Sequence, residues 1–177
     1  MVPDTVLRLA AIQKALEDII RPLLPEDADF AQEQLALMIK SIALVRKQIP
    51  HEHAFHIRDA HAFIEFGRDM MSRLPSSQCT EISDAIECVE AVVPSTVPDQ
   101  EAIERAVLTL RGVIESTIEG LSDPAALAAI GPVVFDHTTR QTLLERLWVV
   151  DTGFDPAPDT LPDIKTAIYG APTGGQA

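Results

Sequence analysis

The thirteen prolines of this 177-residue chain divide it into blocks, and within the blocks apolar residues recur at alternating gaps of three and four. This spacing places side chains on one face of an α-helix. A proline beyond the first turn of a helix removes a hydrogen bond and causes a steric clash, so the prolines indicate where helices begin and end. The pattern predicts an all-α fold, an up-and-down antiparallel bundle of about five to six helices.

The apolar stripes and the prolines together predict where the helices lie. We expect helices over residues 4–21, 27–48, 50–74, 79–93 and 99–120. After residue 123 the pattern predicts a short Ala-rich helical turn that Gly131-Pro132 breaks or kinks. A final helix then covers residues 137–150, with Asp136 or an adjacent threonine as its N-cap.

Proline, glycine and aspartate dominate the chain beyond residue 150. Such a composition disfavours a packed core and predicts an irregular tail, extended or disordered. We therefore expect a helical bundle domain over residues 1–150 and a tail over residues 151–177.

The net charge of −13 is concentrated in the C-terminal part of the chain. Residues 1–75 carry 11 acids and 9 bases, whereas residues 76–177 carry 16 acids and 5 bases. A surface so acidic repels phosphate groups, which disfavours both nucleic-acid binding and attraction to an anionic membrane.

The cysteines and the apolar stretches indicate a cytoplasmic, soluble protein. Cys79 and Cys88 fall in one predicted helix, about 13 Å apart along its axis, which is too far for a disulfide. The start of the chain lacks the basic and apolar segments of a signal peptide. The most apolar stretch, residues 35–45, contains Lys40 and is too short to span a bilayer.

A histidine cluster at the start of the third predicted helix is the most distinctive chemical feature. His53 and His56 continue the apolar stripe of that helix, and Glu52 lies at the edge of the stripe. Two histidines three residues apart can both reach a metal ion, but a complete site needs ligands from other helices. Neither Glu-x-x-His nor His-Glu-x-x-His occurs in the chain. We therefore favour a structural or ligand-binding role for Glu52, His53 and His56, without a metal.

Other chemical patterns give no catalytic residue and no cofactor. His137 lies beside Asp136, with Arg140 one turn on, but adjacent residues of a helix point in different directions. The chain contains no Gly-x-Ser-x-Gly nucleophile motif and no glycine-rich phosphate loop. Aspartates recur every fourth residue in the tail, which does not match the ligand spacing of a calcium loop.

Two segments within residues 9–49 carry a resemblance to known proteins. They are Ile19-Ile20-Arg21-Pro22-Leu23 and Phe30-Ala31-Gln32-Glu33-Gln34-Leu35. They resemble uncharacterised small bacterial helical-bundle proteins that are encoded near aminoglycoside-phosphotransferase-like and acyl-CoA dehydrogenase-like genes. The resemblance implies a bacterial cytosolic setting and a metabolic partner enzyme, and it transfers no catalytic residue.

Two hypotheses for function follow from the sequence. The first is a non-enzymatic helical-bundle interaction or accessory protein, acting as a homodimer, because second apolar rows (Leu37 and Leu44; Ala106 and Val113) exceed what a small bundle buries. The second is a small-ligand- or metal-binding helical bundle with its site near His53 and His56.

Overall fold

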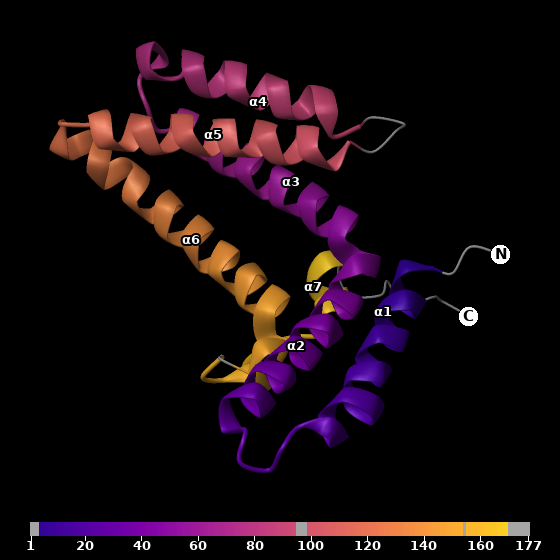
Figure 1. Ribbon diagram of the computed structural model, residues 1–177. Helices are drawn as coiled ribbons and strands as arrows, with labels where there is room; N and C mark the ends of the chain where they lie inside the picture. The colour runs from indigo at the N-terminus through magenta and orange to yellow at the C-terminus, as the bar shows by residue number, and fades with distance from the viewer. Residues whose placement is uncertain (1–3, 95–98, 154, 170–177) are drawn as a thin grey trace, which may run out of the picture. The chain divides into compact units, whose positions relative to one another are not determined.

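The structure, a computed structural model, describes residues 4–94, 99–153 and 155–169. Every regular element in these residues is a helix, and none of them is a strand (Figure 1). The predicted all-α class is therefore confirmed. The up-and-down antiparallel order of the helices stays a prediction.

The described residues group into two compact units. Met1–Glu52 and Arg146–Lys165 belong to the first unit, and His53–Glu145 and Thr166–Ala177 belong to the second, each within the described ranges. Residues 151–153 and 155–165 thus group with the N-terminal helices. The division into a domain over 1–150 and a tail over 151–177 stays a prediction.

The first unit begins with two neighbouring helices, α1 (Thr5–Ala15) and α2 (Asp29–Gln48). The Asp4 side chain caps α1 by accepting from the Val6 amide. A π-helical turn (Leu16–Ile20) and a 3₁₀ turn (Arg21–Leu23) extend α1 to the proline-containing loop. Arg46 Nη1 donates to Gln13 Oε1 at 2.7 Å and so joins α2 to α1.

The chain after the last long helix attaches to α2 within the same unit. Gln48 Nε2 donates to the Trp148 carbonyl at 2.8 Å, and Lys47 Nζ lies 2.6 Å from Asp151 Oδ1. Two 3₁₀ turns (Val150–Thr152 and Pro158–Thr160) and the short helix α7 (Ile164–Tyr169) follow. The described part of the predicted tail is therefore partly helical, and residues 170–177 lie outside the described residues.

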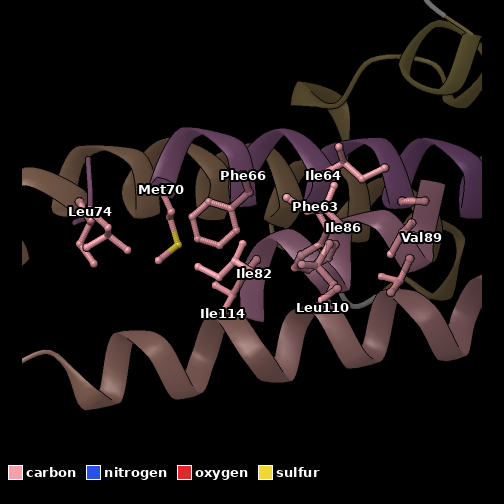
Figure 2. Packing of buried hydrophobic residues seen from close by; sticks show 14 of the residues in the cluster. Phe63, Ile64, Phe66, Met70, Leu74, Ile82, Ile86, Val89, Leu110 and Ile114 are labelled. Carbon is pink, nitrogen blue, oxygen red and sulfur yellow. The ribbon is translucent and has the colours of Figure 1, made fainter. Parts of the chain in front are cut away.

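The second unit contains most of α3 (Glu52–Met71), all of α4 (Thr80–Val92) and α5 (Gln100–Gly120), and most of α6 (Pro124–Val149). Asp99, the first residue of the predicted helix over residues 99–120, caps α5 by accepting from the Ala102 amide at 3.0 Å. The core is mainly aliphatic, in keeping with the scarcity of aromatic residues. Figure 2 shows part of this core: Phe63, Phe66, Met70, Ile82, Ile86, Val89, Leu110 and Ile114.

Gly67 lies where α3 packs against α4. A Cβ atom at this position would meet Ile86 Cδ1 at 3.0 Å and Ile82 Cγ2 at 3.2 Å. Both distances are shorter than ordinary carbon contacts of about 3.5–4.0 Å. The absent side chain of Gly67 therefore permits the close approach of the two isoleucines.

The structure corrects the prediction for residues 124–150. One continuous helix, α6, passes through Pro132, so a break at Gly131-Pro132 and the predicted cap at Asp136 are wrong, whereas the alternative of a kink stays a prediction. Asp136 lies within the helix and binds Arg140 Nη2 at 2.8 Å. The helix continues because Ile130 is buried, and Val133 and Val134 pack against the same core on the other side of the proline. Tertiary packing here outweighs the helix penalty of proline, about 3 kcal/mol.

Candidate functional site

The three predicted site residues differ in exposure and in their contacts. Glu52 and His53 are exposed at the start of α3, whereas His56 is half-buried. His56 Nε2 lies 3.2 Å from Glu104 Oε1 and 3.1 Å from Gln100 Nε2, both on α5. These two contacts join His56 to another helix. Ligand binding at Glu52, His53 and His56 stays a prediction.

No group of three or more histidine, cysteine, aspartate or glutamate side chains could hold a metal ion among the residues that the structure describes. Cys79 and Cys88 are both free.

Two pockets in the second unit bring polar and aromatic side chains together. The α3–α5 pocket, of about 250 Å³, is lined by His56, Asp59 and Glu104 among apolar residues. The three-helix pocket, also about 250 Å³, lies between α3, α5 and α6. Phe63 and Arg111 line both pockets, so the two are neighbours.

His137 is the most deeply buried polar residue of the three-helix pocket. Its side chain is 6% exposed, and its ring stacks on Phe66 with centroids 4.0 Å apart and meets the edge of Phe63 at 4.8 Å. Burial lowers the pKa of His137, and the charges of Arg140 and Arg111 lower it further. The imidazole is therefore mainly neutral at pH 7. It forms no hydrogen bond with the described residues.

Gln141 connects the two pockets through its side-chain amide. Its Nε2 donates to Asp59 Oδ1 at 2.7 Å and to Glu145 Oε1 at 3.3 Å. Because both neighbouring carboxylates accept hydrogen bonds from the NH₂ group, the orientation of the Gln141 amide is fixed. Its Oε1 is then buried without a hydrogen-bond partner in the described structure. A buried acceptor left unpaired costs about 1–3 kcal/mol.

Asp59 is partly desolvated beneath this amide. Burial raises the pKa of Asp59, while the hydrogen bond from Gln141 and the neighbouring His56 oppose the shift. The carboxyl of Asp59 is thus easier to protonate than that of an exposed aspartate. This places a perturbed acid and a neutral histidine within the same group of helices.

Arg111 crosses the boundary between the two pockets. Its guanidinium carbon lies 5.8 Å from the centroid of the Phe63 ring, and its Nε donates to Glu115 Oε1 at 3.2 Å. Stacking on an aromatic face and pairing with a carboxylate both hold the guanidinium in place. The result is a concave, partly aromatic site with a few convergent polar groups, which is typical of ligand-binding pockets.

A larger pocket, of about 460 Å³, lies in the first unit and is lined by residues of α2, the end of α6 and the segment that follows. Its residues Lys47 and Asp151 pair with one another. The three-helix pocket is the stronger candidate, because Gln141, one of its lining residues, has a buried and unpaired Oε1 atom.

Sequence reasoning missed Asp59 and Gln141, and it considered His137 only beside Asp136 and gave it no role. A usable signal existed, because His137, Gln141 and Glu145 follow one another at intervals of four and so share one helix face. The predicted final helix over residues 137–150 contains all three residues, but the sequence does not show which side chains of other helices lie opposite them.

No protein family, curated protein or solved structure matches the chain. Among the described residues, no helix combines the length and the apolar character needed to cross a membrane.

Proposed function

We propose that this chain is a helical interaction protein that pairs with a second copy of itself through α2. The observation that carries the proposal is a row of exposed apolar side chains on this helix. We call it the α2 stripe: Phe30, Leu37, Met38 and Val45, which are 75%, 42%, 52% and 42% exposed.

The members of the α2 stripe lie on one helix face. Their spacings of seven, one and seven residues confine them to an arc of about 100°. The buried residues of α2, Leu35 and Ile39, lie beside this arc. The neighbouring helix α1 contains no buried residue at all within its described length. Large exposed apolar patches of this kind mark interaction surfaces.

The exposure of the two second apolar rows expected from the sequence also favours α2 as the interaction surface. Ala106 and Val113 of α5 are partly buried against the core of the second unit, so that row is already covered. Leu37 of α2 is exposed and Leu44 is half-buried. The apolar excess therefore remains on α2.

Charges beside the α2 stripe favour a second copy as the partner. Glu33 and Lys40 are both exposed, lie seven residues apart on the same edge of the stripe, and form no ion pair with described residues. In an antiparallel pair of α2 helices around a twofold axis, Glu33 of each copy faces Lys40 of the other. The acidic start of α2, at Asp29, likewise meets its basic end, at Arg46 and Lys47.

The net charge of the surrounding chain is also compatible with self-association. Residues 1–52 contain eight acids and six bases, so they carry little of the total charge of −13. Like-charge repulsion between two copies is therefore weakest at this end of the chain.

Sedimentation velocity over a range of protein concentrations tests the proposal. We expect a concentration-dependent dimer that Leu37→Asp shifts to monomer, while Leu108→Asp, at a 65% exposed apolar position on α5, leaves it intact. A monomer at every concentration, as expected if a partner enzyme is the true occupant of the stripe, would refute self-association.

A charge exchange tests the predicted geometry. Glu33→Lys and Lys40→Glu should each weaken the dimer, because each places like charges opposite one another at two symmetry-related positions. The double variant Glu33→Lys/Lys40→Glu restores both pairs and should restore the dimer. If the double variant is weaker than either single variant, the antiparallel arrangement is wrong.

A further inference from the structure

The N-terminal helices of the first unit expose more large apolar side chains than they bury. Over the described residues 4–52, the buried hydrophobic residues are Leu35 and Ile39, both on α2. Nine large hydrophobic residues of the same range are exposed, and five of them lie on α1 or on the π and 3₁₀ turns that extend it. The other four are the α2 stripe. Pairing through α2 alone therefore leaves all five apolar side chains of the α1 segment exposed.

Four of these five side chains share one face of the α1 segment. We call them the α1 stripe: Ile12, Ile19, Ile20 and Leu23, which are 50%, 60%, 42% and 74% exposed. The last three follow Ile12 at seven, eight and eleven residues, spacings that keep side chains on one helix face. The fifth side chain, Leu7, lies five residues before Ile12, which is about 140° away round the helix. Leu7 is therefore on a different face.

The α1 stripe and the α2 stripe lie on the same side of the hairpin that α1 and α2 form. The two helices are antiparallel neighbours joined by a short loop (Figure 1), and the hydrogen bond from Arg46 to Gln13 marks the sides on which they face each other. Ile12 directly precedes Gln13, so it lies about 100° before the facing side. Val45 has the same relation to Arg46. Because the helices run in opposite directions, equal rotations of the same sense bring Ile12 and Val45 to the same side of the hairpin.

The apolar area of the two stripes matches what a stable dimer needs. A fully exposed side chain of about four carbons offers roughly 130 Å² of apolar area for burial. Scaled by the exposed fractions, the α2 stripe offers roughly 270 Å² and the α1 stripe roughly 290 Å² per copy. A standard interface buries about 800 Å² per partner, a little over half of it apolar, which is roughly 450 Å². The α2 stripe alone falls short of this area, and the two stripes together exceed it.

We propose that the α1 stripe is the second half of the self-association surface. In this arrangement α1 and α2 of one copy pack face to face against α1 and α2 of a second copy and form an intermolecular four-helix bundle. The twofold axis that pairs the two α2 helices also places the two α1 segments opposite each other. Each copy thereby covers the exposed apolar face of the other. This inference rests on the self-association proposed above.

Substitutions on different faces of α1 test the proposal by sedimentation velocity. Ile12→Asp places a charge in the proposed interface of both copies and should raise the dimer dissociation constant at least about tenfold, as is expected for Leu37→Asp. Leu7→Asp, at a 62% exposed position outside the α1 stripe, should change it less than about twofold. If Leu37→Asp disrupts the dimer and Ile12→Asp does not, α1 lies outside the interface while self-association through α2 still stands. Equal weakening by Ile12→Asp and Leu7→Asp would also overturn the four-helix arrangement.

Hydrogen exchange of the unaltered chain gives a measurement that needs no substitution in α1. Amide exchange in both α1 and α2 should slow as the protein concentration rises through the range of dimerisation, because both helices become packed between the copies. In Leu37→Asp, exchange in α1 should stay fast at every concentration, although the substitution lies on α2. If exchange slows with concentration in α2 only, the α1 stripe is not part of the interface. An unaltered chain that stays monomeric in sedimentation would refute self-association and this arrangement together.

Discussion

Gly67 and Gly112 provide a sharp test of how closely α3 and α4 pack. Both are helical glycines, and replacing a glycine in a helix interior by alanine removes a penalty of about 1 kcal/mol. At Gly112 a new Cβ meets nothing within 4 Å, so the gain is realised. We expect Gly112→Ala to raise the free energy of unfolding by about 0.5–1 kcal/mol and the melting temperature by about 1–4 °C.

The same substitution at Gly67 meets the side chains of α4. The new Cβ would lie 3.0 Å from Ile86 Cδ1 and 3.2 Å from Ile82 Cγ2. Placing an extra methyl group in a packed core costs about 1–3 kcal/mol. With the helix gain of about 1 kcal/mol subtracted, Gly67→Ala should be between neutral and about 2 kcal/mol destabilising.

A double-mutant cycle separates crowding from other effects. Ile86→Val removes the Cδ1 atom that the new Cβ would crowd, at its own cost of about 0.5–1.5 kcal/mol. The double variant Gly67→Ala/Ile86→Val should therefore be more stable than the sum of the two single changes predicts, by about 1 kcal/mol. Urea unfolding followed by far-ultraviolet circular dichroism measures all four proteins. If Gly67→Ala stabilises as much as Gly112→Ala, the packing argument is wrong.

Three further changes test other parts of the structure. The pKa of His137 is lowered from 6.5 in the folded protein, so the unfolded chain binds more protons near that pH. The free energy of unfolding should therefore fall as the pH drops through about 6.5 toward the lower pKa of the folded state. Urea unfolding between pH 5 and 8 should show this decrease for the unaltered protein and not for His137→Leu. Pro132→Ala restores a backbone donor inside α6 and should stabilise the fold by about 1 kcal/mol or more, and an unchanged melting temperature would show that the proline costs nothing there. Hydrogen bonds from Arg146 and Ala157 hold the pKa of Asp155 at about 2, below its ordinary value of 3.8. The stabilisation from Asp155 is therefore present above pH 3.8 and lost as pH falls toward about 2, and Asp155→Asn should expose the segment after α6 to faster proteolysis at neutral pH.

Local signals in the sequence were sufficient for the helices that end at proline or begin at aspartate. The end of α3 before Pro75 and the start of α5 after Asp99 depend on residues within a few positions, so the local sequence alone locates them. The continuation of α6 through Pro132 depends instead on packing of Ile130 and Val134 against other helices. Contacts distant in sequence decide that case, and a single sequence does not display them.

The same distinction applies to the candidate sites. The histidine cluster around His53 and His56 is conspicuous because its members are adjacent in sequence. His137 is isolated in sequence, and it gains its environment from Phe63 and Phe66, more than seventy residues earlier. Helix periodicity can place His137, Gln141 and Glu145 on one face, but it does not identify the aromatic side chains opposite them.

Trp148 is the chain's single tryptophan and lies in the first compact unit, whereas α4 and α5 lie wholly in the second. Its fluorescence therefore reports on the environment of one unit, while circular dichroism registers helix loss in both. The chain thus carries a built-in optical probe of cooperativity: coincident transitions mean that the two units unfold together, and separated transitions mean that they unfold in sequence.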